Sequence, residues 1–445
     1  SNPTLNNLIF SGNSANFSGG GMYNQNGSPT LTNVTFFGNS ASSGGGMHNS
    51  NSSPILTNVT FNDNSADQGG GMHNDPNSKP TLKDVTFSGN LADEGGGIYN
   101  TSSPTLTNVT FSGNNASVYG GGMYTEISSP TLINVTFSGN SAGDSGGGMY
   151  NSDNSSPSVR NSILWNNLDS SGTGTITASI YNITSTITLT HSLVQGSGGS
   201  VSWVGGSYVD GGNNIDSDPL FVEAVDPAEA PTKGGDLRLQ TGSPAINAGD
   251  NQYVSGIDTD LDGEPRISGG TVDMGAYEFQ CPSVTTQYVD QAASPTGDGS
   301  SWENAYMDIQ DALFVSAACS DINEIWVATG VYTPGVSVYD TFQLLDGVSI
   351  YGGFDPDSGV EEFSDRDWEA FPTVLSGDID GDDITDVNGV VTTTTNIVGD
   401  NSYHVVTGSG VTTTTVLDGF IITAGKANYG IGIPVPELVH NYGAG

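Results

Sequence analysis

Apolar and polar residues alternate over short stretches in the first part of the chain. In the stretch "SPTLTNVTFFGNSASSGGGMHN", which starts at Ser28, the residues Leu31, Val34 and Phe36 are separated by polar residues. This alternation is typical of short β-strands with one buried face. Asn33 interrupts it, and the pieces "GNSA" and "GGG" favour two more bends. We therefore expect the stretch to form three short strands and three bends.

Copies of this stretch follow one another, each marked by a proline, with steps of 24 to 27 residues. The markers are Pro3, Pro29, Pro54, Pro80, Pro104, Pro130 and Pro157. Strand-like repeats of nearly fixed length predict a solenoid whose coils stack in register, with like residues above one another. The expected fold is all-β, a right-handed parallel β-helix. Its expected files are Phe10, Phe36, Phe61, Phe87, Phe111 and Phe137, and an amide ladder of Asn13, Asn39, Asn64, Asn90, Asn114 and Asn140.

The repeat period changes along the chain, which predicts three parts. It loosens after residue 167, but alternating Ile, Val and Thr residues favour further coils, so the repeats are expected at 1–214. Residues 215–280 lack the repeat and are expected to form a closing segment. New strand-like runs predict the start of a second β-helix at 281–445.

A short helix is expected near the start of this last part. Ser300 and Glu303 have the spacing of a capping box, and apolar residues then recur at helical intervals. We therefore expect one α-helix near 302–317 that caps the apolar end of the second β-helix.

The charge balance narrows the possible partners. The 445 residues include 8 Lys and Arg against 48 Asp and Glu, a formal charge of −40. Such a chain is repelled by nucleic acid and by anionic membrane surfaces, and cations are its natural partners. The sequence contains no apolar run long enough for a membrane span. It begins at Ser1 without an initiating methionine or a signal peptide, so we expect a processed or excerpted chain.

The repeated pieces "FSGNSA", "GGGMYN" and "SPTLTNVTF" resemble the polymorphic-outer-membrane-protein repeats of bacterial surface and secreted β-helix proteins. The resemblance covers residues 1 to about 167 and implies a right-handed parallel β-helix in an extracellular or cell-surface protein. Residues 215–280, with "GDLRLQTGSPAINAGD", resemble the choice-of-anchor segment that closes such proteins. Residues 288–427 resemble the beginning of another β-helix of the same family.

The order of these parts predicts an assembly. In the family, a segment like 288–427 precedes the repeats, so the last coil here matches what the family places before residue 1. We predict a head-to-tail homopolymer in which the C-terminal coil of one subunit extends the first coil of the next. The alternative is that the chain is an excerpt of a longer tandem protein. The expected interface consists of Pro3, Leu5, Leu8 and Phe10 at one end and Val416, Leu417, Phe420 and Ile422 at the other.

Two acidic runs are candidate calcium sites. In each run carboxylates alternate along the chain around a glycine, Gly263 or Gly381, that permits a sharp turn. Ca²⁺ takes six to eight oxygen ligands, which such turns can supply, although neither run has the full EF-hand spacing. Solvated acidic loops are the alternative. The candidate ligands are Asp258, Asp260, Asp262 and Glu264 in the first run, and Asp378, Asp380, Asp382 and Asp386 in the second.

Other residues that could carry chemistry have plainer interpretations. His48 and His73 take the repeat position that tyrosine holds in other copies, so a metal pair is possible. We favour aromatic stacking, because tyrosine replaces these histidines elsewhere and the sequence indicates no third ligand. Cys281 and Cys319 form a disulfide or remain two thiols. Arg266 is expected to pair with nearby acids.

The sequons of the repeat are a weak signal for glycosylation. Their asparagines recur because the coils stack, and a bacterial origin disfavours the modification. These asparagines are Asn33, Asn58, Asn108 and Asn134.

These observations predict an extracellular structural protein, the subunit of a β-helical surface filament. An adhesin that binds glycan or protein is the second hypothesis, and a polysaccharide lyase or hydrolase the third. Catalysis is disfavoured because the repeats contain Lys79, Lys83 and Arg160 as their only cations, and because the net charge repels polyuronates.

Overall fold

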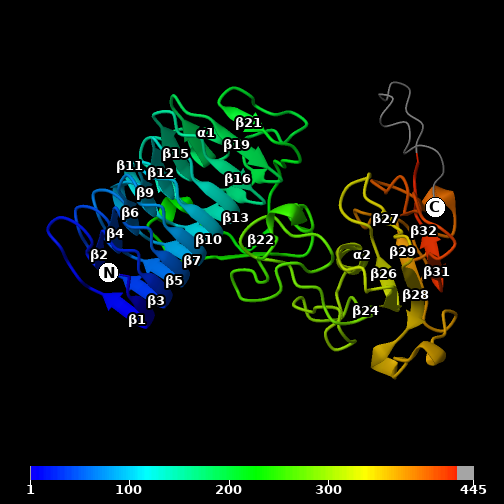
Figure 1. Cartoon of the computed structure of the whole chain (residues 1–445). Helices are drawn as coiled ribbons and strands as arrows, with labels where there is room; N and C mark the ends of the chain where they lie inside the picture. Colours follow the sequence, from blue (N-terminus) through cyan, green and yellow to red (C-terminus); the bar gives the residue numbers. More distant parts are fainter. Residues whose placement is uncertain (1, 428–445) are drawn as a thin grey trace. The chain divides into compact units, whose positions relative to one another are not determined.

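The computed structural model describes residues 2–427. The chain folds into two compact units, and their boundary in the sequence lies between Gln280 and Cys281. Unit 1 precedes this point and unit 2 follows it. Within each unit, strands that follow one another around the coil pair in parallel with their counterparts in the next coil. The parallel β-helix expected from the sequence is therefore confirmed (Figure 1).

Unit 1 contains a long sheet and a second sheet, to each of which the repeat coils contribute one strand (Figure 1). The long sheet comprises β1 (Thr4–Ser11), β3 (Thr30–Phe37), β5 (Ile55–Asn62), β7 (Thr81–Ser88), β10 (Thr105–Ser112), β13 (Thr131–Ser138), β16 (Ser158–Arg160), β17 (Ile163–Trp165), β19 (Ile187–Thr190), β20 (Leu193–Val194) and β21 (Tyr208–Asp210). The second sheet comprises β2 (Met22–Gln25), β4 (Met47–Ser50), β6 (Met72–Asn74), β9 (Ile98–Asn100), β12 (Met123–Glu126), β15 (Met149–Ser152) and β18 (Ile180–Asn182).

A third, shorter sheet completes the coil. It comprises β8 (Leu91–Glu94), β11 (Asn115–Tyr119) and β14 (Ser141–Ala142), and isolated bridges such as Ser14 with Ser40 continue it into the earlier coils. One short helix, α1 (Ile176–Ser179), lies in a later coil where the earlier coils have the glycine triplet, since the N–H of Gly148 donates to the carbonyl of Ala178. The three strands expected for each repeat are present in the coils that contain β8, β11 and β14, whereas the earlier coils have isolated bridges in the third position.

The files predicted from the repeat form the interior of unit 1. Successive phenylalanine rings stack from Phe10 to Phe137, with centroids 4.5 to 4.9 Å apart. The amide ladder also forms: each side-chain Nδ2 donates to the Oδ1 of the asparagine in the next coil, from Asn13 to Asn167. Stacked amides satisfy polar groups that would otherwise be buried without partners.

Each glycine triplet forms a corner of the coil, and its glycines are required there for two different reasons. Gly44 has φ 66°, a conformation that costs other residues strain. Gly45 and Gly46 have ordinary dihedrals, but a Cβ on Gly45 would lie 2.4 Å from the carbonyl oxygen of Ser65, and one on Gly46 2.7 Å from the Phe61 ring. The neighbouring coil therefore leaves room only for hydrogen at these two positions.

The closing segment, residues 215–280, packs on the outside of the long sheet of unit 1. It contains β22 (Phe221–Glu223), η1 (Pro227–Glu229), β23 (Asp236–Leu239) and η2 (Asn251–Tyr253). Its apolar residues form a second core with Ile163 and Leu193, and the backbone N–H of Thr232 donates to the carbonyl of Gly113. The segment therefore covers part of the sheet and creates a boundary where a site can form.

Unit 2 is a less regular β-helix. One sheet contains β24 (Thr286–Val289), β25 (Glu324–Ala328), β28 (Ser349–Phe354) and β31 (Val416–Asp418). The other two contain β26 (Gly330–Tyr332), β29 (Thr373–Ser376) and β32 (Phe420–Thr423), and β27 (Phe342–Gln343) with β30 (Val406–Thr407). Its loops carry η3 (Pro356–Ser358), η4 (Phe363–Asp365) and η5 (Thr394–Asn396).

The helix of unit 2 is shorter than expected. α2 spans Ile309–Ala318, and the side chain of Asp308 accepts from the N–H of Gln310 as its N-cap. The expected start at residue 302 is wrong because the backbone of Tyr306 pairs with Tyr288 and Asp290 and so extends the sheet. The helix buries its apolar face against β24, β25 and β27, as a capping helix should.

Among residues 2–427, no helix combines the length and the apolar character that a membrane crossing would require.

Candidate functional site

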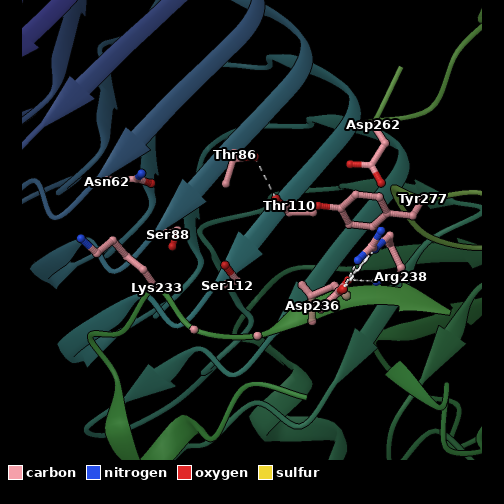
Figure 2. A pocket seen from close by; sticks show the side chains of 13 residues that line it. Asn62, Thr86, Ser88, Thr110, Ser112, Lys233, Asp236, Arg238, Asp262 and Tyr277 are labelled. Atoms are coloured by element: carbon pink, nitrogen blue, oxygen red, sulfur yellow. Dashed lines mark hydrogen bonds and ion pairs between the residues drawn. The ribbon is translucent and has the colours of Figure 1, made fainter. Parts of the chain in front are cut away.

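A polar groove of about 550 Å³ runs between the long sheet of unit 1 and the closing segment (Figure 2). On the sheet side it is lined by hydroxyl groups, one pair per coil, from β7 and β10. Thr110 donates to Thr86 across adjacent coils at 3.3 Å. On the other side half of the lining residues are charged. These are Lys233, Asp236, Arg238 and Asp262.

Charges in the groove are partly paired. Arg238 donates through Nε to both carboxylate oxygens of Asp236, at 2.9 and 3.1 Å, and lowers the pKa of that carboxyl. The ammonium of Lys233 lies 2.7 Å from Asp63. Burial, followed by the neighbouring Asp260 carboxylate, raises the pKa of Asp262. The groove thus presents hydroxyls, the Asp262 carboxylate, which has no ion pair among the described residues, and two paired cations. Such a lining is suited to a polar ligand.

A buried charge cluster holds the closing segment together. Arg266 is 1% exposed, lies 3.4 Å from Glu278 and donates to the carbonyl of Asp273 at 2.9 Å. The expectation that Arg266 pairs with nearby acids is confirmed. Burial raises the pKa of Asp273 to about 7 and that of Glu278 to about 8. Asp260 is the third acid near Arg266. Three acids and one arginine in a buried site favour the retention of a proton at neutral pH.

The first acidic run is not gathered around a common point. Asp260 is buried, and its carboxylate accepts from the backbone N–H groups of Asp262, Glu264 and Glu278 at 2.9 to 3.0 Å. Asp262 faces the groove, while Asp258 and Glu264 are exposed. The Asp260 carboxylate therefore stabilises a turn of the closing segment.

The second acidic run does bring three carboxylates together. Oxygens of Asp378, Asp380 and Asp382 lie within 4.8 Å of one another. Proximity to Asp380 contributes, after desolvation, to a raised pKa of Asp382. Asp386 is separate, because its carboxylate accepts from the N–H groups of Asn388 and Val390 within its own turn.

The two cysteines are joined. The Cys281–Cys319 disulfide connects the start of unit 2 to the residue that ends α2, across 38 residues of sequence. It therefore ties the capping helix to the beginning of the coil.

The residues expected at an assembly interface lie on strand edges. β1 pairs only with β3, β31 only with β28 and β32 only with β29 within residues 2–427. Leu8 is 39% exposed and Ile422 39%, whereas their counterparts in the next coil, Val34 and Leu375, are buried; Val416 is 37% exposed. Leu5, Phe10, Leu417 and Phe420 are half-buried, and Pro3 is exposed. Two apolar coil faces are therefore uncovered by the described residues.

The histidines stack as expected. The rings of His48 and His73 are parallel, with centroids 4.7 Å apart, and they continue the file of Tyr99 and later tyrosines. The sequence indicates no third ligand, but in the structure the carboxylate of Asp75 contacts both imidazoles. Asp75 follows β6 directly, at a position that other copies fill with different residues, so the repeat pattern gave no reason to single it out.

The sequon asparagines are bend residues. Asn33, Asn58, Asn108 and Asn134 all have φ between 51° and 55°. Asn108 and Asn134 are fully buried, and Asn108 donates to the carbonyl of Thr259 in the closing segment. The "NVT" sequence thus recurs because the bend requires a left-handed residue.

Comparison with protein families finds a match to part of the chain. Residues 84–101 match the Chlamydia polymorphic membrane protein repeat, and this stretch is most of one coil, from β7 to β9. No curated protein matches the chain. The repeat match and the β-solenoid together support a surface-associated β-helical protein built from repeats of this type.

Proposed function

We propose that the chain is an extracellular structural protein that assembles head to tail, with the last described coil of unit 2 joining the first coil of unit 1 in another copy. The observation that carries this proposal is a match between the two uncovered coil faces. Leu417, Phe420 and Ile422 have the same spacing as Leu5, Leu8 and Phe10.

The backbone supports the same alignment. In this register Gly419 corresponds to Asn7, and both have positive φ, 86° and 55°. Ala424 corresponds to Gly12, again with positive φ in both, 65° and 64°. A non-glycine residue with positive φ is uncommon, so two bends at matching positions are a specific feature. The edge of β31 and β32 thus has the bend pattern of the coils that stack on β1.

Strand addition at such edges supplies backbone hydrogen bonds and continues the interior files. Leu417 would continue the leucine file, and Ile422 would cover the ring of Phe10. Both edges are apolar, so the joint would bury side chains that are partly exposed in the isolated chain. The high negative charge opposes association, so added salt is expected to favour it.

Electron microscopy and sedimentation of the full chain test the proposal. The wild-type protein should form linear polymers at neutral pH. Leu8→Glu blocks one edge and Phe420→Glu the other, so each variant alone should remain dispersed. A mixture of the two variants should yield dimers and nothing longer, because one good edge remains on each. Val201→Glu, at a position 98% exposed and away from both edges, is the matched control. Dispersed wild-type particles at every concentration would refute the assembly.

Calcium is a second element of this proposal. We propose that Asp378, Asp380 and Asp382 hold one Ca²⁺, since oxygen ligands in a turn suit this ion. Chelator should then lower the melting temperature of unit 2, and Asp380→Asn should remove the effect. Asp386→Asn is the control, because Asp386 caps its own turn. An identical melting curve with and without chelator would count against a structural calcium ion.

An adhesin is the alternative function, and the groove favours it. Rows of hydroxyls beside charged groups resemble the polar linings that bind sugar hydroxyls. Glycan binding that is lost in Arg238→Ala, in a protein that does not polymerise, would favour this function over the filament.

A further inference from the structure

The aromatic file on the second sheet of unit 1 changes character at two adjacent coils. Tyrosine rings occupy the file elsewhere, and neighbouring centroids along it are 4.7 to 5.4 Å apart. At β4 and β6 the rings are the imidazoles of His48 and His73. The two Nε2 atoms reach the same carboxylate: His48 lies 3.1 Å from one oxygen of Asp75, and His73 lies 3.3 Å from the other.

Three departures from the repeat therefore meet at one point. Both histidines replace tyrosine, and the acid stands where the preceding coil has Ser50 and the following one Thr101. Glu126 lies on the same edge two coils further on, but there it accepts a hydrogen bond from the phenol of Tyr99 at 2.9 Å. In the described repeats, an acid facing two imidazoles occurs at this one place.

We infer that His48, His73 and Asp75 form a binding site for one divalent transition-metal ion of the zinc class. Two imidazole nitrogens and one carboxylate oxygen, all within 4.8 Å of one another, are the ligand set that Zn²⁺ and Co²⁺ prefer. Three protein ligands leave a fourth position for water. The hard ions Ca²⁺ and Mg²⁺ prefer oxygen ligands and are disfavoured here.

Burial and access fit such a site. Both histidines are 6% exposed, so their rings are fixed by packing in the file, while the side chain of Asp75 is 33% exposed and opens the site to solvent. The hydroxyl of Ser50 also bonds to Asp75 and orients the carboxylate. Hydrogen bonds of this kind to a ligand are a regular feature of metal sites.

The spacing of the ligand atoms suits a bound ion. A metal that binds through Nε2 requires the ring proton of each histidine to lie on Nδ1. Ligand atoms that surround a tetrahedral ion at about 2.0 Å lie about 3.3 Å from one another. The distances of 3.1 and 3.3 Å between the imidazole nitrogens and the Asp75 oxygens therefore already suit such an ion.

The site would connect adjacent coils. His48 belongs to one coil and His73 to the next, so a bound ion would cross-link β4 and β6 from the outside of the sheet. Metal binding to the folded state alone raises its stability, and above Kd the gain grows with the logarithm of the free metal concentration. The inference does not depend on the filament, because the cluster lies within a single chain.

Titration of the full chain with Zn²⁺ by calorimetry, and with Co²⁺ by visible absorption, tests the inference. Excess Ca²⁺ in the buffer saturates exposed carboxylates. The wild-type chain should bind one equivalent of Zn²⁺ and give Co²⁺ bands of mixed nitrogen and oxygen ligation. The His48→Tyr and His73→Tyr double variant restores the residue that other coils carry, so it should fold with an intact ring file. It should lose this binding event, with affinity reduced by about 100-fold or more, in line with the loss of two ligands.

Asp75→Ser, the residue of the preceding coil, should weaken Zn²⁺ by at least about 10-fold. His191→Asn is the control, because His191 lies on another face and contacts Asn213. Undiminished one-equivalent binding in the double tyrosine variant would overturn the inference, as would a wild-type chain that binds no Zn²⁺ at micromolar concentration.

Discussion

The repeat coils of unit 1 and the coils of unit 2 share one strand pairing but differ in what keeps them in register. From β1 to β13 of unit 1, residues that stack on one another are 24 to 26 positions apart, and every coil carries the same amide and ring. In unit 2, Thr286 pairs with Glu324, and Ser349 pairs with Val416 far along the chain. Unit 2 instead has a disulfide and a helix that packs on its strands.

The difference suggests that repetition can replace cross-links. A coil of constant length stacks its like residues automatically, and each file then contributes packing and hydrogen bonds at every step. Coils of unequal length have no such files, so their loops need separate attachments. The two units should accordingly fail in different ways when they are perturbed.

The largest expected effect comes from removing one ring of the phenylalanine file. Phe87 is fully buried between Phe61 and Phe111, so Phe87→Ala should destabilise unit 1 by about 4 kcal/mol. Hydrogen exchange read by mass spectrometry would localise the loss to neighbouring coils. Phe17→Ala removes a ring that is 81% exposed and should change little. Equal effects of the two changes would show that the file does not stabilise the coils.

The next effect belongs to unit 2. Reduction of the Cys281–Cys319 bond, or replacement of both residues by serine, should destabilise unit 2 by about 3 kcal/mol, because the bond closes a 38-residue loop of the unfolded chain. Denaturant titration with and without reductant, followed by exchange in each unit, measures this. Unit 1 is the internal control and should not respond. A shift of both units together would contradict the separate attachments described above.

A pH change should alter the stability of the closing segment more than that of the repeat coils. Asp273 and Glu278 have folded-state pKa values raised by burial, so the native state holds a proton that the unfolded chain has already lost. Stability is therefore fully present below the ordinary carboxyl pKa and falls as pH rises toward 8. We expect a loss of about 2 kcal/mol between pH 6 and pH 8. Exchange in residues 215–280 should report it.

Glu278→Gln is the matched variant for this pH effect. It removes one of the buried carboxylates and lets Asp273 ionise beside Arg266, so the slope between pH 6 and pH 8 should flatten. A variant with the same slope as the wild type would locate the pH dependence elsewhere.

The smallest effect is a gain. A second amide ladder runs along the other sheet, but Thr125 interrupts it, and the Nδ2 of Asn100 and the Oδ1 of Asn151 are buried without hydrogen-bond partners. Thr125→Asn would provide both partners and should stabilise unit 1 by about 1 kcal/mol, or a few degrees in melting temperature. Thr125→Val is the control, with no gain expected. Destabilisation by asparagine would mean that the coil has no room for the amide at this position.

Most of the first β-helix could be predicted because the same pattern of strands and bends recurs in several copies of one repeat. The files of Leu31, Phe36 and Asn39 follow from the spacing alone, and so do the bends. The closing segment could not be placed, since it does not repeat, and only tertiary packing brings Thr232 to Gly113. The helix start failed for a related reason: strand pairing at Tyr306 overrode the local capping signal at Ser300.

The candidate sites follow the same division. The acidic runs at Asp258 and Asp378 have the same type of sequence. In the first run, however, the buried carboxylate of Asp260 accepts hydrogen bonds from the backbone of the closing segment. The role of Asp75 could not be predicted from the sequence, because it depends on the contacts of Asp75 with His48 and His73 of two different coils. Residue type and spacing predict a file, whereas a departure from the file acquires meaning only when the neighbours are known.

The amide ladder also has a direction. Every Nδ2 donates toward the next coil, from Asn13 through Asn39 to the bond between Asn140 and Asn167, so the column has an acceptor end and a donor end. At the proposed joint, the residue of unit 2 that would precede Asn13 in this column is Gly425, which has no side-chain amide to donate. A fibre built this way has its weakest planes between copies. Under load or dilution it should come apart into whole subunits before any subunit unravels.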